Sequence, residues 1–235
     1  MPELRHITSS ALDELSREAF ESAEVERAAI VVLQGARSWG AHERGAITLP
    51  DDGGTLVFPV SYDAREAPYT VDEQGLERTL ISLSDEEGYL ACVWARPCQG
   101  SSLVGVGIDL ASPRDFDTSE RGRRLTELMF TDAEHDLVNA TFSSNLPYGY
   151  AVAFGAKEAA FKATAAPLRT WYRSHTEELS YDLRHFSLVD PHRARGEARD
   201  GTAQAALDKM GIARIAVQYA EVAGMALVVA TAFNT

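Results

Sequence analysis

This chain of 235 residues contains only three lysines among its 22 basic residues, and two of the three lie close together. Lys157 and Lys162 flank Glu158 in the run 154–162, whose apolar positions have helical spacing. A lysine ammonium is a compact charge on a flexible stem and can bind phosphate as a point charge. Glu158 and Lys162 lie one turn apart and share a side of the expected helix, whereas Lys157 lies about 100° from Glu158. A solvated amphipathic helix would show the same pattern, so the run alone does not establish a binding site.

An aspartate lies near the end of an apolar, β-branched run upstream of these lysines. Residues 103–110 predict a buried strand, and Asp109 is its only charged residue. A carboxylate in apolar surroundings is costly unless it is paired, hydrogen-bonded or bound to a metal. Glycines in a strand often mark a bulge or a close approach of a ligand to the backbone. The alternative is that Asp109 caps the turn that follows.

Together the two runs resemble the motifs of the 4'-phosphopantetheinyl transferase superfamily. Its G-[IV]-D strand reads Gly107-Ile108-Asp109, and its aromatic-x-x-K-E-[AS]-x-x-K helix reads as residues 154–162. Between them, residues 130–134 are similar to the family's F-[ST]-x-x-E segment. The resemblance covers roughly residues 80–186 and implies an α+β fold, with two similar α/β subdomains related by a pseudo-two-fold axis. For the longer branch of the family, these would be residues 1–103 and 104–235, the second carrying the motifs.

The resemblance implies transfer of the 4'-phosphopantetheine group from coenzyme A to a serine of an acyl or peptidyl carrier protein. Asp109 and Glu158 would bind Mg²⁺ or Mn²⁺, because such hard cations take one or two carboxylates plus substrate phosphates and water. Glu158 would also draw the proton from the serine, and Lys162 would bind the pyrophosphate. Lys157 would hold either a coenzyme A phosphate or the geometry of the helix.

Departures from the family's pattern leave room for a homologue that binds a carrier protein or coenzyme A without transfer. Ala111 stands where the longer branch often has a second acid, and Asp85 stands where the family's S-x-S-H segment has a histidine. Ser84 and Arg78 would contact coenzyme A in this segment, and Arg78 or Arg96 could offset the charge of Asp85. Further candidates for the 3'-phosphate of coenzyme A are three arginines, Arg37, Arg44 and Arg65.

Composition limits the classes of function. Apolar residues make up 45% and charged residues 24% of the chain, as in globular proteins, and no apolar run is long enough to span a membrane. The first residues lack the pattern of a signal peptide, and Cys92 and Cys98 lack metal-site spacing, so we expect a cytoplasmic protein. We also expect it to be a monomer. The net charge of −13 argues against nucleic acid as a partner. Carrier proteins are generally acidic, so docking would need a local basic patch, for which residues 120–124 are the candidate. A third alternative is an unrelated nucleotide-binding protein, because residues 104–110 are also similar to the first strand of the actin–sugar kinase fold.

Hydrophobic periodicity and turn residues predict the elements that must position these side chains. The stretch 191–204 predicts a surface loop with a short helix. The other predicted elements, in chain order, are a helix at 12–30, strands at 55–62, 79–84, 88–95 and 103–110, helices at 119–128, 131–140 and 150–166, and strands at 183–189, 213–220 and 224–233.

Overall fold

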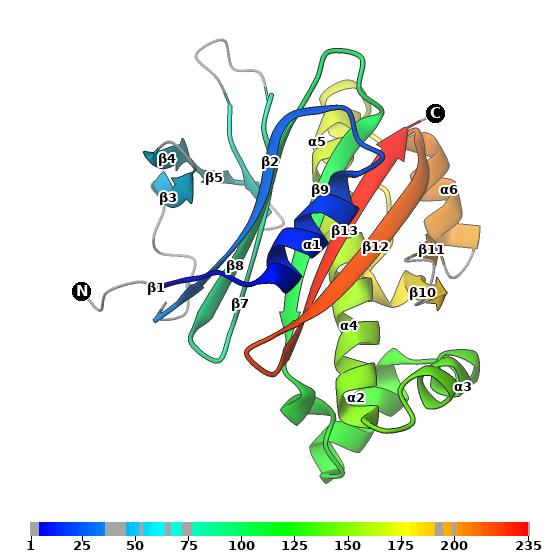
Figure 1. The fold of residues 1–235 in the computed structure, drawn as a ribbon. Coiled ribbons are helices and arrows are strands. Elements are labelled where there is room, and N and C mark those ends of the chain that lie inside the picture. Colours follow the sequence, from blue (N-terminus) through cyan, green and yellow to red (C-terminus); the bar gives the residue numbers. More distant parts are fainter. Residues whose placement is uncertain are drawn as a thin grey trace.

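The computed structural model describes residues 5–35, 46–51, 54–63, 67–71, 77–190, 195–198 and 201–234. The fold is α+β, as the sequence predicts. A four-stranded and a five-stranded antiparallel sheet lie next to each other, with helices packed on them (Figure 1). The pseudo-two-fold relation of two subdomains and the boundary between residues 103 and 104 remain predictions.

The N-terminal half is built on the sheet β1-β2-β8-β7 and helix α1. Helix α1 (Ser10–Phe20) begins at Ser9, whose side chain accepts a hydrogen bond from the Leu12 amide. The prediction of a helix through residue 30 is wrong, because β2 (Val25–Gln34) carries a β-branched run that pairs along β8. The remaining elements of this half are β1 (Arg5–Ile7), β3 (Ala46–Asp51), β4 (Gly54–Pro59), β5 (Ser61–Tyr62), β6 (Pro68–Tyr69), β7 (Leu80–Glu86) and β8 (Tyr89–Pro97).

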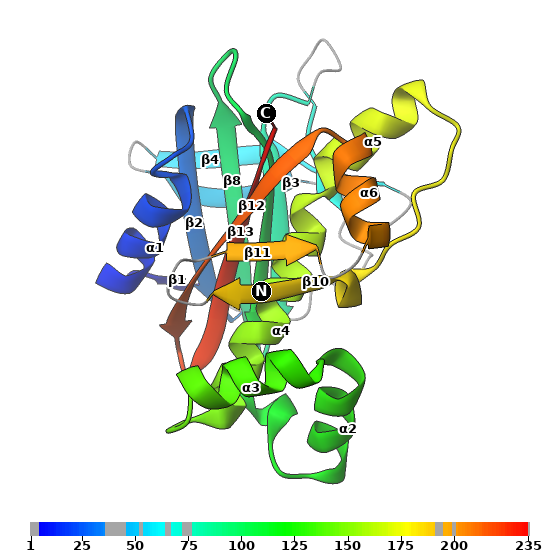
Figure 2. The same cartoon turned by 90° about the vertical axis from the view of Figure 1, so that its right-hand side faces the viewer.

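The C-terminal half is built on the sheet β10-β11-β12-β13-β9, in which the first strand of the half lies at the edge beside the last strand of the chain. Long helix α4 lies along one face of this sheet, while α2 and α3 cluster near the beginning of α4 (Figure 2). The elements are β9 (Leu103–Ala111), η1 (Pro113–Phe116), α2 (Glu120–Met129), α3 (Asp132–Thr141), α4 (Leu146–Ala163), α5 (Ala165–Ser174), η2 (Leu183–His185), β10 (Phe186–Asp190), β11 (Arg195–Ala198), α6 (Gly201–Lys209), β12 (Ile212–Val222) and β13 (Met225–Asn234).

Most of these elements confirm the predictions within a few residues, with further exceptions besides the helix at 12–30. The predicted helix at 150–166 begins four residues earlier, at Leu146, and α5 follows it as a separate helix. The predicted surface loop 191–204 contains strand β11, which pairs with β10 and β12. Short strands such as β1 are not predicted from hydrophobic periodicity, because three residues are too few to show alternation.

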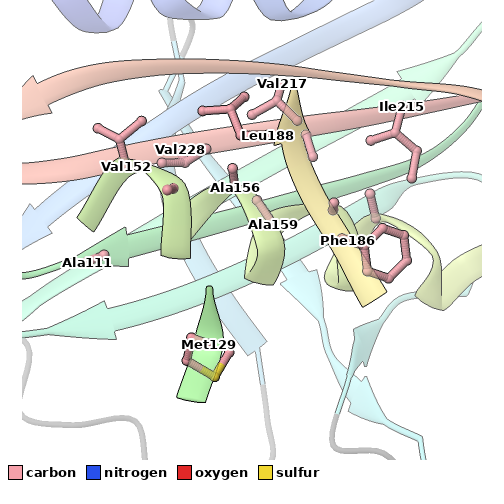
Figure 3. Packing of buried hydrophobic residues seen from close by; sticks show 14 of the residues in the cluster. Ala111, Met129, Val152, Ala156, Ala159, Phe186, Leu188, Ile215, Val217 and Val228 are labelled. Carbon is pink, nitrogen blue, oxygen red and sulfur yellow. The ribbon is translucent and has the colours of Figure 1, made fainter. Parts of the chain in front are cut away.

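Glycines on β9 allow helix α4 to pack unusually close to the sheet. A Cβ atom on Gly107 would lie 1.9 Å from the Ala159 carbonyl oxygen, and one on Gly105 would lie 1.9 Å from the Ala163 carbonyl oxygen. Alanines on the sheet-facing side of α4 extend the same contact (Figure 3). The backbone that approaches these glycines is therefore the motif helix itself rather than a ligand, which the sequence left open.

Two serine hydroxyls join β7 of the first sheet to β9 of the second. Ser82 Oγ accepts a hydrogen bond from the Ile108 amide at 3.2 Å, and Ser84 Oγ accepts one from the Leu110 amide at 3.2 Å. These side chains satisfy amides at the edge of β9, where a further strand would otherwise pair. The S-x-S segment thus brings the end of β7 next to Asp109.

The alternation of β9 divides its side chains between two cores. Val106, Ile108 and Leu110 pack with α1 and the first sheet, whereas Gly105, Gly107 and Asp109 face α4. Asp109 is therefore placed on the helix side of the strand by the register of the apolar residues around it. Among the helices that the structure describes, none combines the length and apolarity needed to cross a membrane.

Candidate active site

Asp109 is a buried carboxylate with defined partners. It is 4% exposed, near the end of β9, and its Oδ1 accepts hydrogen bonds from Ser84 Oγ at 2.9 Å and from Lys162 Nζ at 2.7 Å. Strand β7 and helix α4 supply these donors, so three elements converge on one oxygen atom. This answers the question that the sequence raised about a charge inside an apolar run: the carboxylate is paired and hydrogen-bonded.

Glu158 and Lys162 complete the cluster from α4. Lys162 Nζ lies 3.1 Å from Glu158 Oε2 and donates to the Ile108 carbonyl at 3.1 Å. The two side chains share a side of the helix, as their four-residue spacing predicts. Residues up to 54 positions apart in the chain are thus brought into direct contact, because the glycines of β9 let α4 approach.

The charges of this cluster shift one another's proton affinity. Burial, and then the neighbouring Asp109 carboxylate, raise the pKa of Glu158 to about 7, against the opposing effect of Lys162. Burial by itself would lower the pKa of Lys162, but the two carboxylates outweigh it and the pKa is raised. The cluster therefore contains a firmly charged ammonium and a glutamate whose carboxyl group can exchange a proton near neutral pH.

Glu134 and Lys157 form a second, fully internal ion pair next to the cluster. Lys157 is 0% exposed, and its ammonium contacts the Glu134 carboxylate and donates to the Phe186 carbonyl at 2.6 Å. Glu134 is also the last residue of a capping box, in which its carboxylate accepts from the Thr131 amide at 2.8 Å and so begins α3. The F-[ST]-x-x-E segment therefore anchors α3 against α4.

This pair decides between the two roles considered for Lys157. A side chain sealed inside the protein cannot meet a phosphate in solvent, so contact with a coenzyme A phosphate is wrong for this structure. Lys157 instead holds α4, and with it Glu158, in place. The hint in the sequence was the helical angle of about 100° between these two neighbours, which directs them to different sides.

Of the remaining residues predicted to bind coenzyme A, only Ser84 contacts the cluster in the described part of the chain. Ser84 Oγ donates to Asp109, so in this structure it positions that carboxylate. Arg78 lies before β7 and lines an open groove of 1610 Å³ with Arg96. Both arginines are at the opposite end of the β7–β8 hairpin from Asp85, roughly 20 Å away at ~3.3 Å per residue, so neither offsets its charge. Candidates Arg37, Arg44 and Arg65 lie outside the described residues.

Glu86 is a neighbour of the site that the sequence analysis did not identify. It follows Ser84 by two positions, and strand alternation puts both side chains on the side of β7 toward β9. Burial, followed by Asp115, Glu87, Asp109 and Asp85, raises the pKa of Glu86. Ser82 and Ser84 are two positions apart and both face β9. Continuing this spacing to residue 86 would have identified Glu86 from the sequence. The mouth of the cluster is therefore acidic.

The donor atoms of the cluster fit a hard divalent cation. The Lys162 ammonium already lies among three oxygen atoms, from Asp109, Glu158 and the Ile108 carbonyl, and oxygen is the ligand that Mg²⁺ prefers. Ala111 is buried in the apolar core beside α4, so a second strand acid is missing there. In the described part of the chain, no three His, Cys, Asp or Glu side chains are grouped as metal ligands. The protein would therefore supply two carboxylates.

Comparison with known proteins agrees with the motifs. Residues 105–219 match the family model of the 4'-phosphopantetheinyl transferase superfamily. No curated protein matches the chain. Among solved structures, the chain is similar to holo-[acyl-carrier-protein] synthase from Neisseria meningitidis (16% identity, 55% of this chain and 98% of that one, TM-score 0.40). It is also similar to acyl carrier protein synthase from Mycobacterium tuberculosis (25% identity, 57% of this chain and 99% of that one, TM-score 0.38). A third similar structure is holo-[acyl-carrier-protein] synthase from Helicobacter pylori in complex with coenzyme A (17% identity, 54% of this chain and 98% of that one, TM-score 0.39).

The match spans the segment that carries all three motifs, from the glycines of β9 through α4 to β12. It includes the Glu134–Lys157 pair and the cluster of Asp109, Glu158 and Lys162. Residues 105–219, just under half of this chain, thus match the 4'-phosphopantetheinyl transferase superfamily.

Proposed function

We propose that this protein transfers the 4'-phosphopantetheine group from coenzyme A to a serine of an acyl or peptidyl carrier protein. The observation that carries the proposal is the contact between Asp109, Glu158 and Lys162, which combines two carboxylates with a cation at the motif positions. In the reaction, the serine oxygen bonds to the phosphorus that carries pantetheine, the bond from that phosphorus to 3',5'-ADP breaks, and the serine loses its proton.

Each residue of the cluster has a part in this chemistry. Asp109, held by Ser84, and Glu158 would bind Mg²⁺ or Mn²⁺, which would neutralise charge on the pyrophosphate oxygens when bound. Glu158 accepts the serine proton, directly or through water, as a carboxylate placed beside the reacting phosphate can. Lys162 contacts the pyrophosphate and stabilises the charge that develops on the leaving group. Lys157 and Glu134 keep α4 in position from inside the protein.

A second candidate function is binding of coenzyme A or a carrier protein without transfer. Two observations favour it. Ala111 supplies no carboxylate beside Asp109, and the exposed Asp85 adds negative charge next to Glu86 and Glu87, where a polyanion would approach. Under this alternative, coenzyme A binds to the protein but the carrier protein keeps its mass.

One experiment distinguishes the two functions. The protein is incubated with coenzyme A, Mg²⁺ and a panel of apo carrier proteins, and the intact carriers are weighed by mass spectrometry. Transfer adds the mass of the phosphopantetheinyl group to at least one carrier, and Asp109→Asn, which removes the charge of a predicted ligand, abolishes the addition. Binding of coenzyme A in calorimetry with no change in any carrier's mass would favour the non-catalytic function instead.

A further inference from the structure

The Lys162 ammonium occupies the space between the two carboxylates of the site. It donates to Asp109 Oδ1 at 2.7 Å and to the Ile108 carbonyl at 3.1 Å, and it lies 3.1 Å from Glu158 Oε2. An ammonium has three N–H donors, and three oxygen atoms surround this one. In this structure, Lys162 is therefore directed at the protein's own acids.

The same acids are the residues proposed to bind the divalent cation. Mg²⁺ holds its oxygen ligands at about 2.0–2.1 Å and demands a near-octahedral arrangement. A second positive charge in hydrogen-bond contact with the same two carboxylates competes with such an ion by charge repulsion and by occupying ligand oxygens. Asp109 has little freedom to turn away, because it is 4% exposed and Ser84 holds the same oxygen atom.

The Lys162 side chain is partly accessible to solvent. Its side chain is 27% exposed, as is that of Glu158, so this end of α4 faces the open side of the site. A lysine stem is flexible and its charge is compact, whereas the planar guanidinium of arginine would be fixed by its fork geometry. A phosphate that enters from this side offers the ammonium an alternative anionic partner.

We propose that Lys162 is the resident counter-ion of Asp109 and Glu158, and that it must transfer to a phosphate of coenzyme A before the divalent cation binds tightly. The inference rests on the proposed function, because coenzyme A supplies the phosphate. Phosphates of coenzyme A already couple the binding of metal and coenzyme A by contributing ligands to the metal. Release of Lys162 from the carboxylates would be a second cause of that coupling. Without coenzyme A, the divalent cation encounters carboxylates that are paired with Lys162. With coenzyme A, it encounters carboxylates that Lys162 has released.

The test measures Mn²⁺ binding to the full chain, with and without coenzyme A, from the electron paramagnetic resonance signal of free Mn²⁺. Lys162→Met keeps an unbranched side chain, one atom shorter than that of lysine, and removes its charge. We expect this variant to bind Mn²⁺ alone at least ~10-fold more tightly than the wild type, because its two carboxylates have lost their internal partner. The increase in Mn²⁺ affinity on addition of coenzyme A should be correspondingly smaller than in the wild type.

Lys209→Met is the matched control, since it removes the same charge from an exposed lysine that pairs with Glu177. It should leave Mn²⁺ affinity unchanged, which separates a local effect from a change in net charge. Lys162→Gln provides a second neutral side chain should the methionine variant fail to fold, as judged by circular dichroism. Mn²⁺ affinity in the absence of coenzyme A that is equal to or weaker than wild type in the folded variant would overturn the counter-ion role. A wild-type protein that binds neither coenzyme A nor Mn²⁺ with coenzyme A would instead contradict the proposed function.

Discussion

Lys157 and Lys162 lie five residues apart on α4, and their surroundings give the two ammonium groups different tasks. Lys157 is sealed inside the protein against Glu134, whereas Lys162 lies at the partly open site with Asp109 and Glu158. A cation that is enclosed and paired can only hold structure, while one with access to solvent can exchange partners. At the scale of residues, burial therefore separates the structural lysine from the one that can contact substrate.

The first prediction at this scale concerns the proposed base. Glu158→Gln keeps the size of the side chain but removes both its charge and its ability to accept a proton. We expect the rate of phosphopantetheine transfer to fall by at least ~10²-fold, since general base catalysis typically contributes that much or more. Initial rates measured by mass spectrometry check this, with Glu177→Gln, an exposed glutamate, as the control. A folded Glu158→Gln variant with near wild-type rate would remove Glu158 from the mechanism.

A second residue-scale prediction concerns Asp85, where the chain departs from the family's histidine. Asp85 is exposed at the hairpin end of β7, one residue after the serine that holds Asp109. Two unit charges about 6 Å apart repel by roughly 3 kcal/mol at an effective dielectric of 20, before screening by salt. Asp85→His should therefore tighten coenzyme A binding in calorimetry, more strongly at pH 6 than at pH 8, because the imidazole gains charge at low pH. Equal affinity of variant and wild type at both pH values would place Asp85 away from the ligand.

At the scale of elements, the contact between β9 and α4 positions the site. The glycines of β9 remove the side chains that would hold the helix away, and the helix then presents Glu158 and Lys162 to the strand's aspartate. The atoms that a new Cβ would meet belong to the backbone of α4, so relief requires a shift of the whole helix. A side chain added at these glycines is therefore expected to lower the stability and the activity of the protein together.

Gly107→Ala tests this contact. Its Cβ would lie 1.9 Å from the Ala159 carbonyl oxygen and 2.7 Å from the Ala163 amide nitrogen. We expect the free energy of unfolding to fall by about 1–3 kcal/mol, as in overpacked cores, and the transfer rate to fall further because small misplacements of catalytic groups are costly. Urea denaturation and initial rates measure the two effects. Gly201→Ala, whose Cβ would meet nothing within 4 Å, is the control and should change stability by less than ~0.5 kcal/mol.

The Glu134–Lys157 pair gives a second prediction at this scale. Glu134→Gln leaves the fully buried Lys157 ammonium without its carboxylate, and breaking a buried pair in this way typically costs about 3–5 kcal/mol. The double variant Glu134→Gln/Lys157→Met should lose less stability, since it leaves no unpaired buried charge. Chemical denaturation of the three proteins checks the order. A double variant less stable than Glu134→Gln would contradict this account of the pair.

The same pair predicts the direction of a pH dependence. Burial would raise the pKa of Glu134, but the hydrogen bond and charge of Lys157 outweigh it and hold the pKa below the ordinary value of 4.5. A carboxyl group with a lowered pKa in the folded state stabilises the protein above its ordinary pKa, and this stabilisation is lost as pH falls through the lowered value. The melting temperature of the wild type should thus decrease below about pH 4.5 more steeply than that of the double variant. Parallel curves for the two proteins would show that the pair contributes no such dependence.

At the scale of the whole molecule, the net charge of −13 opposes an acidic partner, so docking depends on where the positive charges lie. Helix α2 carries three exposed arginines, Arg121, Arg123 and Arg124, near the beginning of α4 (Figure 1). Each lies within 4.0 Å of an acidic neighbour, but exposed pairs of this kind contribute little stability and can exchange partners.

Charge reversal on α2 tests its part in docking. The variant Arg124→Glu should raise the KM for an acidic carrier protein by about 5-fold and leave the KM for coenzyme A unchanged, because rim charges act mainly on association. The difference from wild type should shrink at high salt. Arg17→Glu on α1, an exposed arginine with acidic neighbours, is the matched control and should leave both constants unchanged. Equal effects of the α1 and α2 changes would indicate a response to net charge alone.

From the sequence by itself, the resemblance to the 4'-phosphopantetheinyl transferase superfamily implied the α+β class and identified the motif residues. Most of the elements were predicted from local hydrophobic periodicity, which depends only on the spacing of side chains within single elements. The sequence also predicted that Glu158 and Lys162 share a side of their helix. The predicted ends of helices and strands were wrong where local patterns were ambiguous. An example is residues 21–34, where an apolar run could extend a helix or begin a strand.

Only the tertiary structure decided which charges meet. It enclosed Lys157 with Glu134, directed Lys162 to Asp109, gave Ser84 the task of holding that aspartate, and left Arg78 at the far end of its hairpin. Each outcome depends on the register of β7, β9 and α4 relative to one another, which is set by packing between elements distant in the chain. Spacing within an element fixes the side to which a residue points, but the partner it finds there is fixed by the element packed against that side.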